Sequence, residues 1–250
     1  MPPILTAEEK ERYSRQLMMP EIGEHGQMRI RQAQVFIAGL GGLGSITAYY
    51  LASAGVGCLK VADPDRVALH NLNRQILHFS SDVGALKTES AHSKLSALNP
   101  LCRIEALAVS IDDDSVDTLV RGCDLIVDGT DNLETRRVLN RAAWAHGIPF
   151  IFGAVGGFDG MAATFIPGRS ACLECIFPTG DNAPTGAIGV LGPAAGLIAC
   201  LQSMEALKIL TGNDADLAGG LTHFQGRGMR FKQTVVLPDP DCPVCSPNRS

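Results

Sequence analysis

The sequence predicts an α/β fold: a mostly parallel sheet flanked by helices, with an antiparallel extension in the C-terminal half. Three observations predict it. Short apolar segments alternate with helical ones through the first 153 residues, a glycine-rich turn follows the first apolar segment, and glycine-punctuated segments take over after Gly153. Such alternation is typical of parallel strands joined by right-handed crossovers. We expect one domain over residues 1–250, with an α/β half at 1–153 and a mixed half at 154–250.

The expected elements follow in order along the chain. Residues 6–18 predict a helix, because Thr6 is a good N-cap, acidic residues fill the first turn and Pro20 follows. Strands are expected near Val35, Leu59, Ile104, Leu125 and Phe150, separated by helices from Ser45, near 85–98, in 112–120 and near 133–146. In the second half we expect antiparallel strands in 156–168 and 231–237, and a long helix over 191–212.

Composition and charge limit the class of protein. A chain of 250 residues, 46% hydrophobic and 19% charged, is long enough to bury a core. Its net charge of −5 argues against a general nucleic-acid binder, which is usually basic. No apolar run reaches the roughly 18 residues of a membrane span, and the N-terminus lacks the apolar core of a signal peptide. We therefore expect a cytoplasmic protein without nucleic-acid or membrane partners.

The glycine-rich turn is the first candidate site. In AGLGGLGS, Gly39, Gly41 and Gly44 fit the pattern G-x-G-x-x-G between an expected strand and an expected helix. Such glycines permit a tight turn, let the backbone approach a phosphate and let helix and strand pack closely. Asp63 ends the next strand nineteen residues after Gly44, where a carboxylate can bind ribose hydroxyls. The first half is therefore predicted to be Rossmann-like and to bind a nucleotide.

Residues after this turn decide which nucleotide is expected. Asn71, Arg74 and Lys87 follow Asp63 within 25 residues. Taken singly, the two cations would be ordinary surface residues. Hydride transfer has no need of two fixed cations near the phosphates, whereas attack on the α-phosphate of ATP does, because negative charge grows on the phosphoryl oxygens. Asp131 ends another expected strand and is a candidate ligand of Mg²⁺, a role compatible with N-capping the next helix. Together these residues favour ATP over NAD.

The cysteines point to a metal. Four of the eight form two C-x-x-C pairs, CLEC with Cys172 and Cys175 and CPVC with Cys242 and Cys245. Two such pairs can supply a closed tetrahedral zinc site of the structural type, although 66 residues separate them. A redox function is the alternative, but CPVC does not follow a strand in a thioredoxin-like pattern. The remaining cysteines are expected to be small buried residues: Cys58, Cys102, Cys123 and Cys200.

The ordered set of motifs resembles the ThiF/MoeB/HesA family, the bacterial relatives of the ubiquitin-activating enzymes. The motifs are RYSRQ, GLGGLG, the aspartate of VADPD, NLNRQ, the lysine of GALKTESA, GTDN and the two late cysteine pairs, from about Arg12 to Cys245. The resemblance implies ATP-dependent adenylation of the C-terminal glycine carboxylate of a small ubiquitin-like sulfur carrier protein ending in Gly-Gly, with release of pyrophosphate. The pathway would be thiamine or molybdopterin biosynthesis or a related sulfur transfer.

The same resemblance implies roles for individual residues. Asp63 would bind the ribose of ATP, the three residues that follow it would contact the phosphates, and Asp131 would serve Mg²⁺. Arg15, in RYSRQ, would reach the phosphates from the neighbouring subunit of a homodimer. The candidate catalytic residues are Arg15, Arg74, Lys87 and Asp131. The candidate nucleotide-binding residues are Gly39, Gly41, Gly42, Gly44, Asp63, Asp65, Asn71, Arg74, Lys87, Asp131 and Asn132.

Two features depart from the family, and two other interpretations compete with it. Many members carry a loop cysteine before the long helix, where this chain has Thr185, and a hydroxyl cannot replace a thiolate in sulfur exchange. No sulfurtransferase segment follows CPVC. We therefore expect the acyl-adenylate to pass to a separate sulfur donor. The competing interpretations are an NAD-dependent oxidoreductase, which leaves Arg74, Lys87 and the cysteine pairs unexplained, and a non-catalytic zinc-stabilised binding module.

Overall fold

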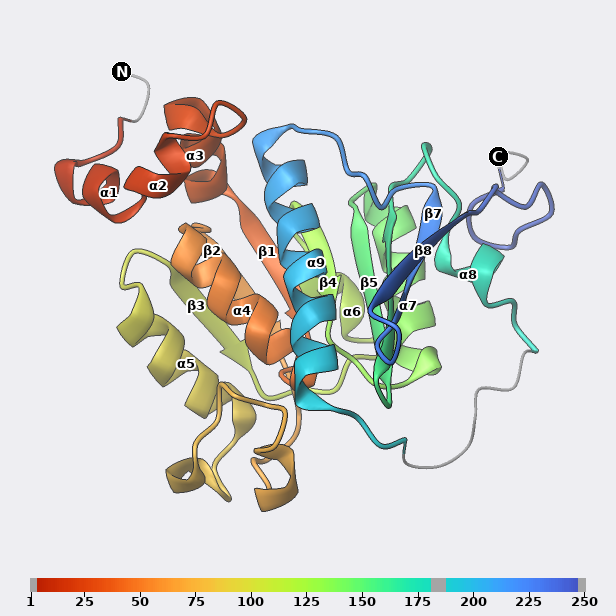
Figure 1. Ribbon diagram of the computed structural model, residues 1–250, viewed down its shortest axis with the longest axis horizontal. Coiled ribbons are helices and arrows are strands. Elements are labelled where there is room, and N and C mark those ends of the chain that lie inside the picture. Colours follow the sequence, from red (N-terminus) through yellow and green to blue (C-terminus); the bar gives the residue numbers. More distant parts are fainter. Residues whose placement is uncertain (1–3, 181–187, 247–250) are drawn as a thin grey trace.

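One sheet forms the centre of the computed structural model, which describes residues 4–180 and 188–246 (Figure 1). Its eight strands lie in the order β3-β2-β1-β4-β5-β6-β7-β8. The first five strands are parallel, and the last three add antiparallel pairs, which confirms the predicted fold class. The strands are β1 Gln34–Ala38, β2 Cys58–Ala62, β3 Arg103–Leu107, β4 Leu125–Asp128, β5 Phe150–Gly156, β6 Asp159–Phe165, β7 Gly220–Gln225 and β8 Arg230–Val235.

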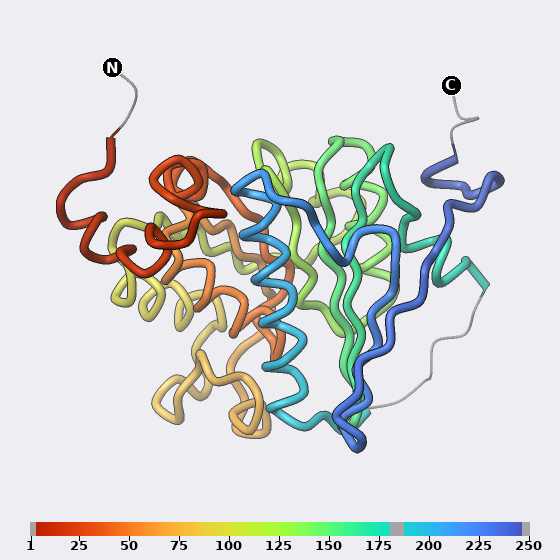
Figure 2. The backbone as a smooth tube through the Cα atoms, turned by 45° about the horizontal axis from the view of Figure 1, so that its top comes forward, coloured from red at the N-terminus to blue at the C-terminus, as the bar shows by residue number. Residues whose placement is uncertain are grey.

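Helices cover both faces of the sheet. Successive residues of β1 alternate between two cores: Val35 and Ile37 face α3, α4, α5 and α9, whereas Phe36 and Ala38 face α6, α7 and α8. Because both faces are buried, the central strands β1 and β4 are mostly apolar rather than alternating, whereas the edge strand β3 is partly exposed and carries Arg103 and Glu105. Figure 2 shows the resulting three layers. The helices are α1 Ala7–Arg12, α2 Ser14–Leu17, α3 Gly23–Gln32, α4 Gly42–Ala54, α5 Lys87–Leu98, α6 Val116–Val120, α7 Leu133–His146, α8 Leu173–Ile176 and α9 Gly192–Thr211.

The strand order reverses beside β1, and this reversal places the candidate site. From β1 the chain moves outward to β2 and β3, then returns to β4 on the other side of β1. The crossovers after β1 and β4 therefore diverge, and in open α/β sheets ligands bind at the carboxyl ends of strands at such a reversal. In Figure 1 these ends lie at the lower edge of the sheet, together with the glycine turn and the segment between β2 and α5.

The first predicted helix differs from the structure. Thr6 caps α1 as expected, since its hydroxyl accepts the Glu9 N–H at 3.2 Å while the Glu9 carboxylate accepts the Thr6 N–H at 2.7 Å. The helix nevertheless breaks at Tyr13, which divides it into α1 and α2. The Tyr13 ring is buried, and its hydroxyl accepts a hydrogen bond from Asn99 at 2.9 Å. Anchoring of this ring accounts for the break that the local sequence does not indicate.

The short helix α8, the helix α3, the strand β7 and one boundary were not anticipated. α3 has no apolar stripe, and its buried residues are Gly26, Gln27 and Ile30. β7 was not among the expected strands, although it pairs with both β6 and β8. The division after Gly153 falls inside β5, and one sheet runs through both proposed halves.

Helix α9 corrects the expectation that no segment of the chain is long and apolar enough for a membrane span. This 20-residue helix is long and apolar enough to cross a membrane by length and composition, with a mean hydropathy of 1.3. Polar residues such as Gln202, Glu205 and Lys208 interrupt its apolar runs, so a count of uninterrupted runs misses it. In the structure 56% of its apolar window is buried, against α4 and the sheet. The core helix of a globular domain meets the same test, so α9 is weak evidence for a span.

Candidate nucleotide-binding site and cysteine cluster

The glycine turn joins β1 to α4 and needs glycine for two distinct reasons. Gly39 has φ +87°, and a Cβ there would lie 2.9 Å from the Gly129 carbonyl oxygen. A Cβ on Gly44 would collide with the Gly39 carbonyl. Gly41 differs, because the nearest protein atom is 3.6 Å from the position its Cβ would take. The protein itself therefore excludes side chains at Gly39 and Gly44, whereas a Cβ on Gly41, at the N-terminus of α4, would make only ordinary van der Waals contacts.

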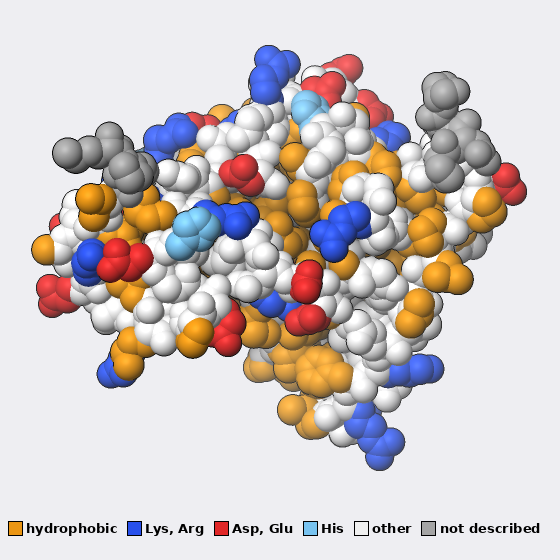
Figure 3. All heavy atoms as spheres, turned by 90° about the horizontal axis from the view of Figure 1, so that it is seen from above, with side chains coloured by type: hydrophobic (Ala, Val, Ile, Leu, Met, Phe, Trp, Pro, Cys, Tyr) orange, Lys and Arg blue, Asp and Glu red, His pale blue; other side chains and the backbone are white. Residues whose placement is uncertain are grey.

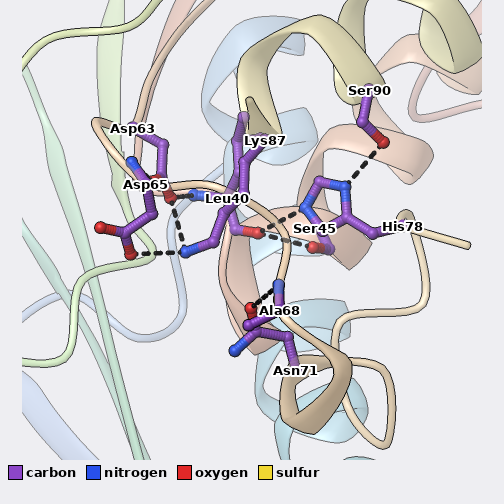
Figure 4. A network of polar contacts seen from close by, with 9 residues as sticks. All are labelled: Leu40, Ser45, Asp63, Asp65, Ala68, Asn71, His78, Lys87 and Ser90. Atoms are coloured by element: carbon purple, nitrogen blue, oxygen red, sulfur yellow. Dashed lines mark hydrogen bonds and ion pairs between the residues drawn. The ribbon is translucent and has the colours of Figure 1, made fainter. Parts of the chain in front are cut away.

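Asp63, directly after β2, holds the glycine turn in place. One carboxylate oxygen, Oδ2, accepts the backbone N–H of Leu40 at 2.7 Å, and Oδ1 accepts the N–H of Asp65 at 2.9 Å (Figure 4). Only 5% of Asp63 is exposed. Charge-assisted hydrogen bonds of this kind are strong, so the carboxylate fixes its own orientation and that of the turn.

Lys87, the first residue of α5, brings a buried cation to the same place. Its ammonium group donates to Asp65 Oδ2 at 2.7 Å and lies 3.4 Å from Asp63 Oδ2 (Figure 4). Lys87 is 5% exposed, whereas the Asp65 side chain is 66% exposed. A buried ammonium group is tolerated only when it is paired. The two carboxylates thus neutralise Lys87 at the carboxyl end of β2.

Asn71 and Arg74 approach the turn from the segment between β2 and α5. Asn71 is buried, and its Oδ1 accepts the Ala68 N–H at 2.9 Å, while its amide nitrogen points away from this bond (Figure 4). The Arg74 guanidinium donates to the His70 carbonyl and to Asn73 Oδ1, both at 3.1 Å. Its Cγ lies 3.6 Å from the position that a Cβ on Gly42 would occupy. Arg74 therefore lies beside the glycine turn, and Asn71 holds the segment that leads to it.

The end of β4 differs in detail from the expectation. Asp128 is fully buried: its Oδ1 accepts from the backbone and hydroxyl of Thr130, and its Oδ2 pairs with Arg136 at 2.8 Å. Asp131 is exposed. The N-cap of α7 is Asn132, whose Oδ1 accepts the Thr135 N–H at 2.8 Å, so the predicted capping role of Asp131 is wrong. Asp131 thereby keeps an exposed carboxylate at the carboxyl edge of the sheet.

Arg15 lies apart from these residues. It is exposed on α2, which precedes β1 and lies at the upper edge in Figure 1, opposite the glycine turn. On the face seen in Figure 3, from above this edge, acidic and basic side chains are interspersed. One copy of the chain therefore brings Asp63, Asp65 and Lys87 together and leaves Arg15 on the far side.

The two C-x-x-C pairs meet at the opposite end of the sheet from β3. All four sulfur atoms lie within 4.8 Å of one another, and these are Cys172, Cys175, Cys242 and Cys245. Cys172 lies 3.6 Å from Cys242 and Cys175 lies 3.4 Å from Cys245, too far for disulfides, whose bond is roughly 2.0 Å long. Backbone N–H groups of Asp239 and Val244 point at two of the sulfurs, at 3.4 Å each.

The cluster fits a tetrahedral metal. Ligands about 2.3 Å from a zinc ion lie roughly 3.8 Å apart in tetrahedral geometry, close to the sulfur separations found here. Burial raises the pKa of the Cys172 thiol to about 12. A metal that binds Cys172 at neutral pH must therefore displace the proton of this thiol. Of the other four cysteines, Cys58, Cys102 and Cys123 are buried as expected, and Cys200 is partly exposed.

The model of the ThiF family matches residues 13–244. The chain belongs to the ThiF family. It is 39% identical over 245 residues to the SAMP-activating enzyme E1 of Haloferax volcanii, covering 96% of this chain and 90% of that protein. It is 40% identical over 251 residues to the sulfur carrier protein adenylyltransferase of Thermus thermophilus, covering 96% and 92%.

Solved structures with the same fold agree with this family assignment. Crystal structures of E. coli MccB superpose on this ThiF-family chain with a TM-score of 0.85 for the complex with MccA-N7isoASN, covering 94% of this chain and 75% of MccB. The TM-score is 0.81 for MccB with ATP, covering 88% and 69%. The sequence identity is 22% in both comparisons. At this identity the likeness establishes the fold.

Sequence reasoning missed several residues of this ThiF-family site. His78 is 3% exposed and contacts the Leu40 carbonyl and Ser90. The Arg136 guanidinium donates to Asp128 Oδ2 and to the carbonyl oxygens of Thr130 and Gly153. Arg136 had a signal, since it follows the GTDN motif by one helical turn on α7. His78 had none, because a single histidine does not indicate a contact with a distant turn.

Proposed function

We propose that this chain transfers AMP from ATP to the C-terminal glycine carboxylate of a small ubiquitin-like sulfur carrier protein, as a nucleotidyltransferase. The observation that carries the proposal is the buried Lys87, held between Asp63 and Asp65 beside the glycine turn. A fixed cation here suits a triphosphate and serves no step of hydride transfer. The names of the relatives, a sulfur carrier protein adenylyltransferase and a SAMP-activating enzyme, supply the reaction and the substrate class.

ATP would lie across the carboxyl ends of β1 and β2. Gly41 has no side chain, so a phosphate could approach the backbone at the N-terminus of α4, where backbone N–H groups and the helix dipole favour an anion. The Asp63 carboxylate would accept hydrogen bonds from the ribose hydroxyls through its remaining lone pairs. Lys87 would exchange its contact with the exposed Asp65 for a phosphate oxygen, and Asn71 and Arg74 would bind further phosphate oxygens.

Asp131 and Asn132 would hold Mg²⁺ and the nucleotide from the β4 side. Mg²⁺ takes one or two carboxylates together with phosphate oxygens. Asp131 offers an exposed carboxylate, whereas Asp128 is already occupied by Thr130 and Arg136. When bound, the ion would neutralise charge on the phosphates.

The reaction needs little acid–base chemistry from the protein. A carboxylate oxygen of the carrier attacks the α-phosphorus, the P–O bond to the β-phosphate breaks, and pyrophosphate leaves with the bonding electrons. The products are acyl-adenylate and pyrophosphate. Because the carboxylate is ionised at neutral pH, no general base is required. Lys87, Arg74 and the glycine turn then contribute by positioning the phosphates and stabilising the charge that develops on them.

We assign Zn²⁺ to the four-cysteine cluster. Sulfur ligands, near-tetrahedral spacing and N–H groups pointing at sulfur all suit a structural zinc ion. Such an ion would tie residues 238–246 to α8 and stabilise the fold without entering the reaction.

A homodimer would complete the site. Almost half of the apolar window of α9 is not buried in the single chain, and Met204 on α9 and Tyr50 on the adjacent α4 are more than half exposed. A second copy packed on this face would cover them, and Arg15 of that copy would then reach the phosphates. This arrangement gives Arg15, which lies away from the site of its own chain, a catalytic role.

The remaining parts of the proposal concern the partners. The carrier would end in Gly-Gly and act in thiamine or molybdopterin biosynthesis or a related cytoplasmic sulfur transfer. A separate protein would donate the sulfur, because Thr185 replaces the loop cysteine; Thr185 lies outside the described residues. Membership of the ThiF family and the names of the relatives argue against an NAD-dependent oxidoreductase.

Pyrophosphate release tests the proposal. The chain is incubated with ATP, Mg²⁺ and small Gly-Gly-ending carrier proteins, and release is compared with carriers lacking the last glycine. We expect release only with an intact C-terminus. A thermal shift with NAD and none with ATP would support the oxidoreductase instead.

A further inference from the structure

Both backbone polar groups of Leu40, its N–H and its carbonyl, form hydrogen bonds to side chains within the glycine turn and around it. Its N–H donates to Asp63 at 2.7 Å, while its carbonyl accepts from the Ser45 hydroxyl at 2.9 Å and from His78 Nε2 at 3.2 Å (Figure 4). Leu40 is completely buried between Gly39 and Gly41. These contacts come from β2, from the first turn of α4 and from the segment before α5. Together they set the direction of the N–H groups that follow in the turn.

His78 joins the turn to the helix that carries Lys87. Its Nδ1 lies 2.9 Å from the Ser90 hydroxyl, and Ser90 follows Lys87 by three residues on α5. A carbonyl only accepts, so Nε2 must carry the proton. Burial lowers the pKa of His78, which favours the neutral ring at pH 7. Nδ1 then faces the Ser90 hydroxyl, which also donates to Asp82 Oδ2 at 3.1 Å. One side chain thus spans the two parts of the site that are proposed to face the triphosphate.

We infer that His78 is a positioning residue, whose Nε2–H bond to the Leu40 carbonyl aligns the glycine turn with Lys87 for the triphosphate of ATP. The inference rests on the proposed function. Without this bond, the turn keeps the contacts of Asp63 and Ser45 but is no longer tied to α5. The turn and Lys87 can then move independently, and the phosphates lose a fixed geometry. The adenosine part, bound through Asp63, keeps its contacts.

Two substitutions separate the contacts of the two ring nitrogens. His78→Gln places an amide N–H near the position of Nε2 and keeps the bond to Leu40. His78→Asn ends at the position of Nδ1, so it keeps a polar contact to Ser90 and loses Leu40. Calorimetric titration with ATP and, separately, with adenosine measures binding without any carrier protein. The exposed His25→Asn on α3 is the control, and thermal unfolding checks that each variant folds.

We expect His78→Asn to bind ATP about tenfold more weakly, the usual effect of one lost hydrogen bond, with adenosine affinity unchanged. His78→Gln should bind ATP like the wild type. The inference is overturned if both variants bind ATP normally, or if ATP and adenosine affinities fall together, because a general loss of packing would affect both. Failure of the wild type to bind ATP would contradict the proposed function itself.

Discussion

The Asp63 carboxylate accepts the Leu40 backbone N–H at 2.7 Å, so the residue that follows β2 holds the turn that follows β1. The same oxygen lies 3.4 Å from the Lys87 ammonium group. One buried carboxylate therefore orients both the backbone donors of the turn and the cation beside them. We therefore expect the proposed ATP site to be formed before the ligand binds.

Removal of Lys87 tests the cation. We expect Lys87→Ala to lower the rate of carrier-dependent pyrophosphate release by roughly 10²–10³-fold, the usual effect of deleting one preorganised donor. Asp63 and Asp65 would lose their cationic partner and repel the phosphates. The measurement is kcat at saturating ATP. Lys232→Ala, at an exposed position on β8, is the matched control. An equal loss of activity in both variants would contradict a specific role of Lys87.

Mixing two inactive variants tests the dimer. Arg15→Ala and Lys87→Ala are each expected to be nearly inactive. In a mixed dimer, the chain with Arg15→Ala keeps Lys87 and receives Arg15 from its partner, so one site of two is intact. Random mixing through a two-fold interface should restore about a quarter of wild-type activity. Activity that stays at the level of the single variants would contradict a site shared between subunits.

The proximity of the glycine turn and Asp63 was predictable because its signals are local. Three glycines at fixed spacing after an apolar strand, and an aspartate at the end of the next strand, are readable without knowing the fold. Residues that act across the fold were not predictable. His78 reaches a carbonyl 38 residues away, and Tyr13 breaks a helix because its ring is anchored by Asn99. β7 is defined by its pairing with β6 and β8 rather than by an alternation of apolar and polar residues in its own sequence.

Removal of zinc tests the cysteine cluster. Cys242→Ser should abolish stoichiometric zinc in the purified protein and lower Tm, by about 2–4 °C for each kcal/mol of stability lost. Metal analysis and thermal unfolding provide the two readouts. Cys200→Ser on α9 removes a thiol outside the cluster and should retain the metal. Full zinc content in Cys242→Ser would show that the cluster is not the binding site.

The buried His78 predicts a pH dependence of stability. Burial lowers its pKa from the usual 6.5, with further lowering by Lys87 and Lys94, against the raising effects of the Leu40 hydrogen bond and Asp63. Below pH 6.5 the unfolded chain binds a proton that the folded chain refuses, so this contribution to stability is present above pH 6.5 and is lost as pH falls. One proton gives a slope of at most about 1.4 kcal/mol per pH unit.

Urea unfolding between pH 7.5 and 5.5 measures this slope. His78→Gln has no titrating ring and should lose less stability over the same range. Because other groups titrate equally in both proteins, the difference between them isolates His78. Identical slopes would mean that the ring takes up its proton equally in both states.

The most direct test of the account is ATP–pyrophosphate exchange with a carrier whose C-terminus is varied. The account predicts exchange that requires the free carboxylate of the terminal glycine and disappears when that carboxylate is amidated. Equal exchange with the amidated carrier would contradict adenylation of the C-terminus.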